Sequence, residues 1–142
     1  MREKNLKNTF YVSIGSNINK EENIKKCKKL LKLEFEKILF SKVYETKPVG
    51  YQKQEDFLNA ICRIESNKSN NEVIIILKQT EKKLKRKKTK IKSGPRTIDL
   101  DLIIWNKKNS HTSATQSYNL VGLKEILVKG EAEKSIEKLL KQ

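Results

Sequence analysis

The chain has 142 residues, a length that fits one domain with a substantial core, and we expect residues 1–142 to form a single domain. Its 32 basic and 17 acidic side chains leave a formal net charge of +15, which predicts attraction to polyanions such as nucleotides, nucleic acids or anionic membranes. The first ten residues lack the apolar stretch of a signal peptide, and no apolar run approaches the roughly 20 residues that cross a bilayer, so we expect a cytoplasmic protein without membrane contact.

The first part of the chain alternates strands with helices. Residues 1–8 are polar and basic, which predicts a flexible lead. Apolar side chains at every second position indicate strands, and apolar side chains at helical spacing indicate helices. The predicted strands are residues 10–14, 38–44 and 57–65, and the predicted helices are residues 20–33 and about 70–84.

Local signals refine these elements. Ser16 or Asn17 is placed to cap the first helix, and Ser69 or Asn70 is placed to cap the second. Cys27 and Cys62 share their helical or strand faces with aliphatic residues, so we expect two buried thiols and neither a disulfide nor a metal site.

A fourth strand follows a glycine-proline turn and carries two aspartates. Alternation places Asp99 and Asp101 on one face, about 6–7 Å apart at their Cα atoms, because a strand rises about 3.3 Å per residue. Neighbouring carboxylates repel unless a proton or a cation lies between them, and hard oxygen ligands suit Mg²⁺ that is shared with substrate phosphates. Arg96 and the lysine-rich run over residues 82–92 lie nearby in the sequence. This combination is typical of a polyphosphate site.

The order of elements is βαββαβ, which predicts an α+β fold of the ferredoxin-like type, an antiparallel sheet with both helices on one face. Residues 106–117 are polar and predict a loop, and residues 123–141 contain two short helical patterns separated at Gly130. The other face of the sheet is expected to be open, with Phe57 and Asn59 on it beside the two aspartates. An aromatic ring and a carboxamide suit a flat heterocycle.

A different class of function fits part of this pattern. Ferredoxin-like sheets that bind RNA stack bases on aromatic residues of their first and third strands, which here would be Tyr11 and Phe57. Against this, two carboxylates on that face would repel phosphates unless a metal ion intervened, and the third strand lacks the basic and aromatic run of such modules. We therefore keep an RNA-binding module as the alternative and expect no nucleic-acid partner.

One stretch resembles a known family. Lys92-Ser93-Gly94-Pro95-Arg96-Thr97-Ile98-Asp99-Leu100-Asp101-Leu102-Ile103-Ile104 resembles the most specific motif of 6-hydroxymethyl-7,8-dihydropterin pyrophosphokinase, and the resemblance covers about residues 10–105. It implies a folate-pathway enzyme, 2-amino-4-hydroxy-6-hydroxymethyldihydropteridine diphosphokinase, which transfers pyrophosphate from ATP to 6-hydroxymethyl-7,8-dihydropterin and releases AMP. The implied cofactor is a pair of Mg²⁺ ions bound with ATP. We expect a monomer.

The resemblance also assigns roles to individual residues. It implies catalytic roles for Arg86, Arg96, Asp99 and Asp101, with both aspartates as metal ligands. It implies pterin binding by Gly15, Thr46, Pro48, Val49, Phe57, Asn59 and Tyr118. It implies nucleotide binding by Glu81, Arg86, Lys88, Arg96, Ile98 and His111.

The sequence departs from the family pattern at four places. Lys85 stands where the family has glycine, Ser93 replaces an aromatic residue, Gln116 occupies an arginine position, and His111 lacks the proline that follows it in the family. The C-terminal part, residues 106–142, is divergent and shortened. A catalytically weakened paralogue is therefore a further alternative.

Overall fold

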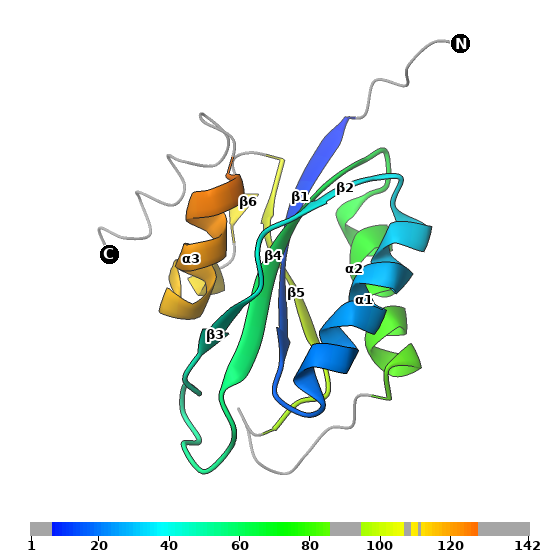
Figure 1. Ribbon diagram of the computed structural model, residues 1–142. Coiled ribbons are helices and arrows are strands. Elements are labelled where there is room, and N and C mark those ends of the chain that lie inside the picture. Colours follow the sequence, from blue (N-terminus) through cyan, green and yellow to red (C-terminus); the bar gives the residue numbers. More distant parts are fainter. Residues whose placement is uncertain (1–6, 86–94, 107–108, 111, 128–142) are drawn as a thin grey trace.

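The computed structural model describes residues 7–85, 95–106, 109–110 and 112–127 (Figure 1). The expected flexible lead falls mostly outside these residues, and its last residue, Asn8, already belongs to the first strand. The elements of the described residues are, in chain order, β1 (Asn8–Ser16), α1 (Lys20–Glu34), β2 (Lys37–Phe40), β3 (Tyr44–Thr46), β4 (Phe57–Ser66), α2 (Asn70–Lys83), β5 (Asp99–Trp105), β6 (Asn109–Ser110), the 3-10 turn η1 (Thr112–Thr115) and α3 (Ser117–Ile126).

The strands form one antiparallel sheet in the order β2-β4-β1-β5-β6, and β3 also pairs with β4. If β2 and β3 are counted as one interrupted strand, this is the ferredoxin-like βαββαβ arrangement, which confirms the predicted α+β fold. Figure 1 shows α1 and α2 together on one face of the sheet and α3 on the other.

The face under α1 and α2 holds the larger core. Alternate residues of β1, namely Phe10, Val12 and Ile14, pack there against the buried stripes of both helices. Cys27 and Cys62 lie in this core as free, buried thiols, as expected. Burial raises the pKa of Cys27 to about 12, so its thiol stays protonated at neutral pH.

The two helices begin differently. Of the two predicted caps of α2, Ser69 is the one that the structure shows: its hydroxyl accepts the Glu72 backbone N–H at 3.2 Å, and the Glu72 carboxylate accepts the Ser69 backbone N–H at 3.1 Å. The predicted cap of α1 by Ser16 or Asn17 is wrong. The residue before α1 is Asn19, in the left-handed conformation and without a side-chain capping bond. Ser16 and Asn17 instead bond to segments far away in the sequence.

The predicted strand over residues 38–44 is interrupted at Ser41. The Ser41 backbone N–H donates to the Ile61 carbonyl oxygen, and the Ser41 hydroxyl accepts the Ile61 backbone N–H, both at 2.8 Å. A side chain therefore takes the place of a backbone acceptor at this point, and β2 and β3 pair with β4 on either side of it.

The opposite face is not fully open, which corrects the expectation for the C-terminal part. Residues 106–117, predicted as a loop, include β6 and η1, and α3 begins at Ser117 rather than near residue 123. The side chains of Leu123 and Ile126 on α3 pack against Tyr11, Ile61 and Ile103 of the sheet. The pattern predicted around Gly130 lies outside the described residues.

A register shift in the β1–β5 pairing contributes to this second core. The pairing shifts between Tyr11 and Val12, so that Ile103 and Ile104 are both buried in the cluster under α3.

In the part of the chain that the structure describes, none of the helices has the length and apolar character required to cross a membrane.

Candidate functional site

A polar row crosses three strands on the face that carries α3. Gly15 of β1 lies opposite Asn59 of β4 on one side and opposite Asp99 of β5 on the other. Adjacent strands are about 4.8 Å apart, so a carboxamide and a carboxylate face each other across roughly 10 Å with a glycine between them. A Cβ atom at Gly15 would lie 3.2 Å from Asn59 Oδ1 and 3.7 Å from the Phe57 ring. The glycine therefore keeps the centre of the row hollow.

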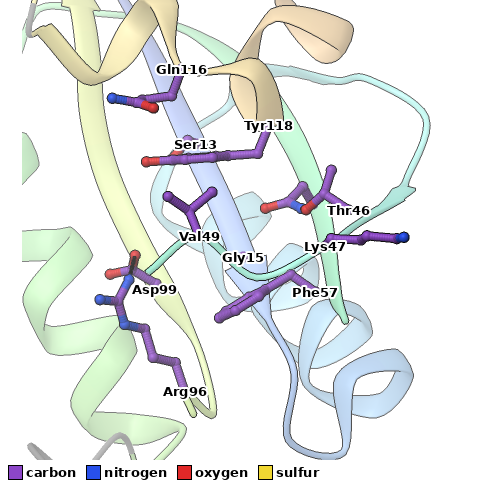
Figure 2. Close-up of a pocket in the computed structure, with 11 residues that line it drawn as sticks. Ser13, Gly15, Thr46, Lys47, Val49, Phe57, Arg96, Asp99, Gln116 and Tyr118 are labelled. Atoms are coloured by element: carbon purple, nitrogen blue, oxygen red, sulfur yellow. Dashed lines mark hydrogen bonds and ion pairs between the residues drawn. The ribbon is translucent and has the colours of Figure 1, made fainter. Parts of the chain in front are cut away.

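The hollow is a cavity of about 200 Å³. Figure 2 shows Phe57 on one side of it and Tyr118 on the other, with Gly15 on the strand behind. The lining residues are Ser13, Gly15, Thr46, Lys47, Val49, Phe57, Asn59, Arg96, Asp99, Gln116 and Tyr118.

The residues expected at a pterin site mostly meet here. Six of the seven line the cavity, and Pro48 is buried outside the lining. The Asn59 amide donates a hydrogen bond to the Thr46 hydroxyl, which fixes the orientation of the carboxamide. Its oxygen is then directed toward Gly15 and remains an acceptor beside the cavity.

An ion pair closes the opposite side of the cavity. Arg96 donates to the Asp99 carboxylate at 2.8 Å, and the two side chains are 30% and 17% exposed. In this partly buried pair the Arg96 guanidinium balances the negative charge of the Asp99 carboxylate, and a guanidinium at this position is also suited to bind phosphate oxygens.

Asn17 fixes the backbone of Arg96. The Arg96 N–H donates to Asn17 Oδ1 at 2.7 Å, and the Asn17 N–H donates to the Arg96 carbonyl oxygen at 3.0 Å. The Asn17 amide also donates to Gln54 Oε1 at 2.8 Å and to the Glu55 carbonyl oxygen at 2.9 Å. This buried side chain thus joins three segments at one end of the cavity, a role that the sequence analysis missed.

Asp101 lies in the next row of the sheet, opposite Ser13, and is exposed outside the cavity lining. Both aspartates lie near Tyr118. Burial raises the pKa of the Tyr118 hydroxyl, and the negative charges of Asp101 and Asp99 raise it further.

The two carboxylates fit a divalent cation of the hard type. They are close, lie on one face of β5 and offer only oxygen atoms, which is the donor set that Mg²⁺ takes from proteins when phosphates and water complete its shell. Among the described residues, no group of three or more histidine, cysteine or acidic side chains could hold a metal ion by itself.

Two of the residues predicted to bind nucleotide also have structural contacts. The Glu81 carboxylate accepts the Leu100 N–H at 2.9 Å, so it holds the backbone between the two aspartates. The Ile98 side chain is fully buried in the core under α1 and α2, so a contact between Ile98 and a nucleotide would have to come from its backbone. Arg86, Lys88 and His111 lie outside the described residues.

The lining also contains Ser13, Lys47 and Gln116, which the sequence analysis did not propose as site residues. Ser13 could have been identified from the sequence, because it lies two residues before Gly15 on the same strand and therefore on the same face of the sheet. Lys47 follows Thr46 at the end of β3, and Gln116 directly precedes α3, whose position on this face was not predicted.

The RNA-binding alternative loses one of its two aromatic platforms. Tyr11 is fully buried, and its hydroxyl accepts a hydrogen bond from Arg63 Nε at 3.0 Å. A base cannot stack on a ring that is covered by the cluster under α3.

Comparisons with known proteins agree on one family. A family model described as 7,8-dihydro-6-hydroxymethylpterin-pyrophosphokinase matches residues 11–128. A Bacillus subtilis protein named 2-amino-4-hydroxy-6-hydroxymethyldihydropteridine pyrophosphokinase is 34% identical over 110 residues, which cover 75% of this chain and 65% of that protein. A protein of the same name from Aquifex aeolicus is 36% identical over 100 residues, 68% of this chain and 61% of that protein.

A longer relative matches as well. The bifunctional protein FolKE of Lactococcus lactis subsp. cremoris is 36% identical over 118 residues, 80% of this chain and 32% of that protein. The chain therefore spans less than two thirds of the length of each of these three relatives.

Proposed function

The chain belongs to the 7,8-dihydro-6-hydroxymethylpterin-pyrophosphokinase family, and from this premise we propose that it transfers pyrophosphate from ATP to 6-hydroxymethyl-7,8-dihydropterin. The products would be AMP and the pterin diphosphate, an intermediate of folate biosynthesis. One observation carries the proposal: the two rings, the carboxamide and the Arg96–Asp99 pair line a single cavity of about 200 Å³.

The pterin would occupy the part of the cavity between Phe57 and Tyr118. Two aromatic side chains on opposite sides of the cavity offer stacking surfaces to both faces of a flat ring. The Asn59 oxygen, held in place by the bond from its amide to Thr46, would accept a hydrogen bond from the edge of the ring. Gly15 leaves the space that the ring needs.

The triphosphate of ATP would lie on the side of Arg96 and the aspartates. Asp99 and Asp101 would hold two Mg²⁺ ions that enter with ATP, and these ions would supply positive charge to the phosphate oxygens. Arg96 would exchange its bond to Asp99 for phosphate oxygens, so that the release of one ion pair accompanies nucleotide binding.

In the proposed reaction, the hydroxyl oxygen of the pterin attacks the β-phosphorus of ATP in line with the leaving AMP. A new oxygen–phosphorus bond forms, the bond from the β-phosphorus to the oxygen that AMP retains breaks, and the hydroxyl loses its proton. The stacked ring and Asn59 would orient the hydroxyl, and Arg96 would stabilise the charge that develops on the phosphates.

Product analysis tests this function. Purified protein with ATP, Mg²⁺ and the pterin should release AMP and the pterin diphosphate in equal amounts, measured by anion-exchange chromatography. Release of ADP, or no product at high enzyme concentration, would contradict the proposal. Asp99→Asn should lower kcat at least about 100-fold, because a ligand for Mg²⁺ is lost while the shape is kept.

A matched control separates this effect from a general loss of charge. Glu22→Gln removes a carboxylate on α1 that pairs with Lys26, away from the cavity. Its kcat should stay within about twofold of the parent value, because surface ion pairs contribute little. Unchanged circular dichroism spectra would show that both variants fold.

A further inference from the structure

Tyr44 connects β3 to the start of α3. Its hydroxyl donates a hydrogen bond to the carbonyl oxygen of Tyr118 at 2.6 Å. Tyr44 opens β3 and lies opposite Asn59 of β4, whereas Tyr118 is the second residue of α3. Tyr118 lines the cavity and Tyr44 is absent from its lining. The bond therefore acts on the backbone of a cavity residue from outside the cavity.

Gly122 allows α3 to lie this close to the sheet. A Cβ atom at this position would come within 2.5 Å of Ile61 Cγ1, a distance that real Cβ atoms do not adopt, and would make a tight contact of 3.0 Å with the Tyr44 hydroxyl oxygen. Glycine in a helix interior costs about 1 kcal/mol relative to alanine, and the close approach of α3 to β4 is what requires it here.

Other contacts hold the second half of α3. Leu123 and Ile126 pack into the cluster with Tyr11 and Ile61, and the Glu125 carboxylate accepts the Lys42 backbone N–H at 2.6 Å. These contacts lie in the second half of the helix, whereas the bond from Tyr44 acts on its first turn, at the carbonyl oxygen of the cavity residue Tyr118. Loss of this bond would remove a fixed point of the Tyr118 backbone and leave the helix docked.

We propose that Tyr44 is a positioning residue for pterin binding: its hydroxyl holds the first turn of α3 so that the Tyr118 ring stays at the distance from Phe57 that admits the pterin. The inference rests on the proposed function and extends it to a residue that does not touch the substrate. Burial raises the pKa of Tyr44 to about 12, an effect that the nearby Gly122 backbone N–H opposes, so the hydroxyl keeps its proton at neutral pH.

A double-mutant cycle tests the inference. Calorimetry would measure pterin binding to the parent protein, Tyr44→Phe, Tyr118→Ala and the double variant, each with a non-hydrolysable ATP analogue and Mg²⁺. Tyr44→Phe should weaken pterin binding about threefold to tenfold, the range for one lost hydrogen bond. In the Tyr118→Ala background it should have no further effect, because the ring that it positions is absent. Affinity for the ATP analogue should change less than about twofold.

Two control variants separate positioning from stability. Tyr11→Phe removes another buried tyrosine hydroxyl, which bonds to Arg63 away from the cavity, and should leave pterin affinity unchanged. Gly122→Ala should weaken pterin binding as Tyr44→Phe does, because the added methyl group displaces α3 from Ile61. Val121→Ala, at an exposed neighbour, should not.

The possible results distinguish the inference from the function on which it rests. If Tyr118→Ala weakens pterin binding and Tyr44→Phe does not, or if Tyr44→Phe has the same effect in both backgrounds, the positioning role is wrong and the proposed function stands. If the parent protein does not bind the pterin, both are wrong.

Discussion

The two faces of the sheet are filled in different ways by the same strands. Toward α1 and α2, β1 presents Phe10, Val12 and Ile14 to a continuous apolar core. Toward α3, β1 presents Tyr11 to a second apolar cluster but Gly15 to a cavity. The first face is closed along its length, whereas the second is closed at one end and hollow at the other. The site exists because α3 covers only part of a face.

The largest expected effect comes from filling the hollow end. Gly15→Val would place two methyl groups where a Cβ atom already meets Asn59 at 3.2 Å, so pterin affinity should fall at least about 100-fold. Ile14→Val, one residue earlier and on the closed face, should cost about 1 kcal/mol of stability and leave pterin affinity unchanged. Calorimetric titration and thermal melts would measure both; equal pterin affinities for the two variants would contradict the comparison.

The second-largest effect is expected at Asn17, which connects the segments around the cavity. Asn17→Ala removes the side-chain bonds to Gln54, Glu55 and Arg96, so unfolding free energy should fall by about 2–3 kcal/mol, and kcat should fall at least about tenfold because Arg96 is no longer fixed. Asn23→Ala removes a buried asparagine that bonds to the Ile18 carbonyl oxygen at the start of α1. Asn23→Ala should lower the unfolding free energy by about 1 kcal/mol and leave kcat unchanged. Denaturant unfolding and steady-state kinetics would test the pair, and equal kcat values would refute a site-specific role for Asn17.

The smallest effect is expected at the end of α2. Lys85 has a φ of 61°, in the left-handed region that favours glycine, at a position where the sequence resemblance led us to expect glycine. Lys85→Gly should raise the unfolding free energy by about 0.5–1 kcal/mol, measured by denaturant titration. Lys78→Gly, at an exposed position in the interior of α2, should instead lower it by about 1 kcal/mol. A loss of stability with Lys85→Gly would show that its φ is not strained.

The closed face was predictable from sequence because periodicity encodes it. The apolar positions of β1, α1 and α2 repeat at the spacing of their elements. On the other face of the sheet, the two-residue spacing of Asp99 and Asp101 likewise predicted that these two side chains share a face. The cap of α2 was predicted to within one residue, as Ser69 or Asn70, because capping depends on residues close together in the sequence.

The partly open face was less predictable because its contacts are tertiary. Gly122 argues locally against a helix, yet its missing side chain is what allows α3 to contact Ile61. Asn17 has the sequence position of a helix cap, yet its bonds go to Gln54, Glu55 and Arg96. The interruption at Ser41 depends on a bond to Ile61, 20 residues away. None of these partners is visible within a local window.

A crystal structure with 6-hydroxymethyl-7,8-dihydropterin, a non-hydrolysable ATP analogue and Mg²⁺ would test the central claim most directly. We expect the pterin ring between Phe57 and Tyr118, with its hydroxymethyl group toward Asp99 and with Arg96 on the phosphates. A pterin bound elsewhere, or phosphates and metal ions that contact neither Asp99 nor Asp101, would contradict the assignment of the hollow end of the sheet as the active site.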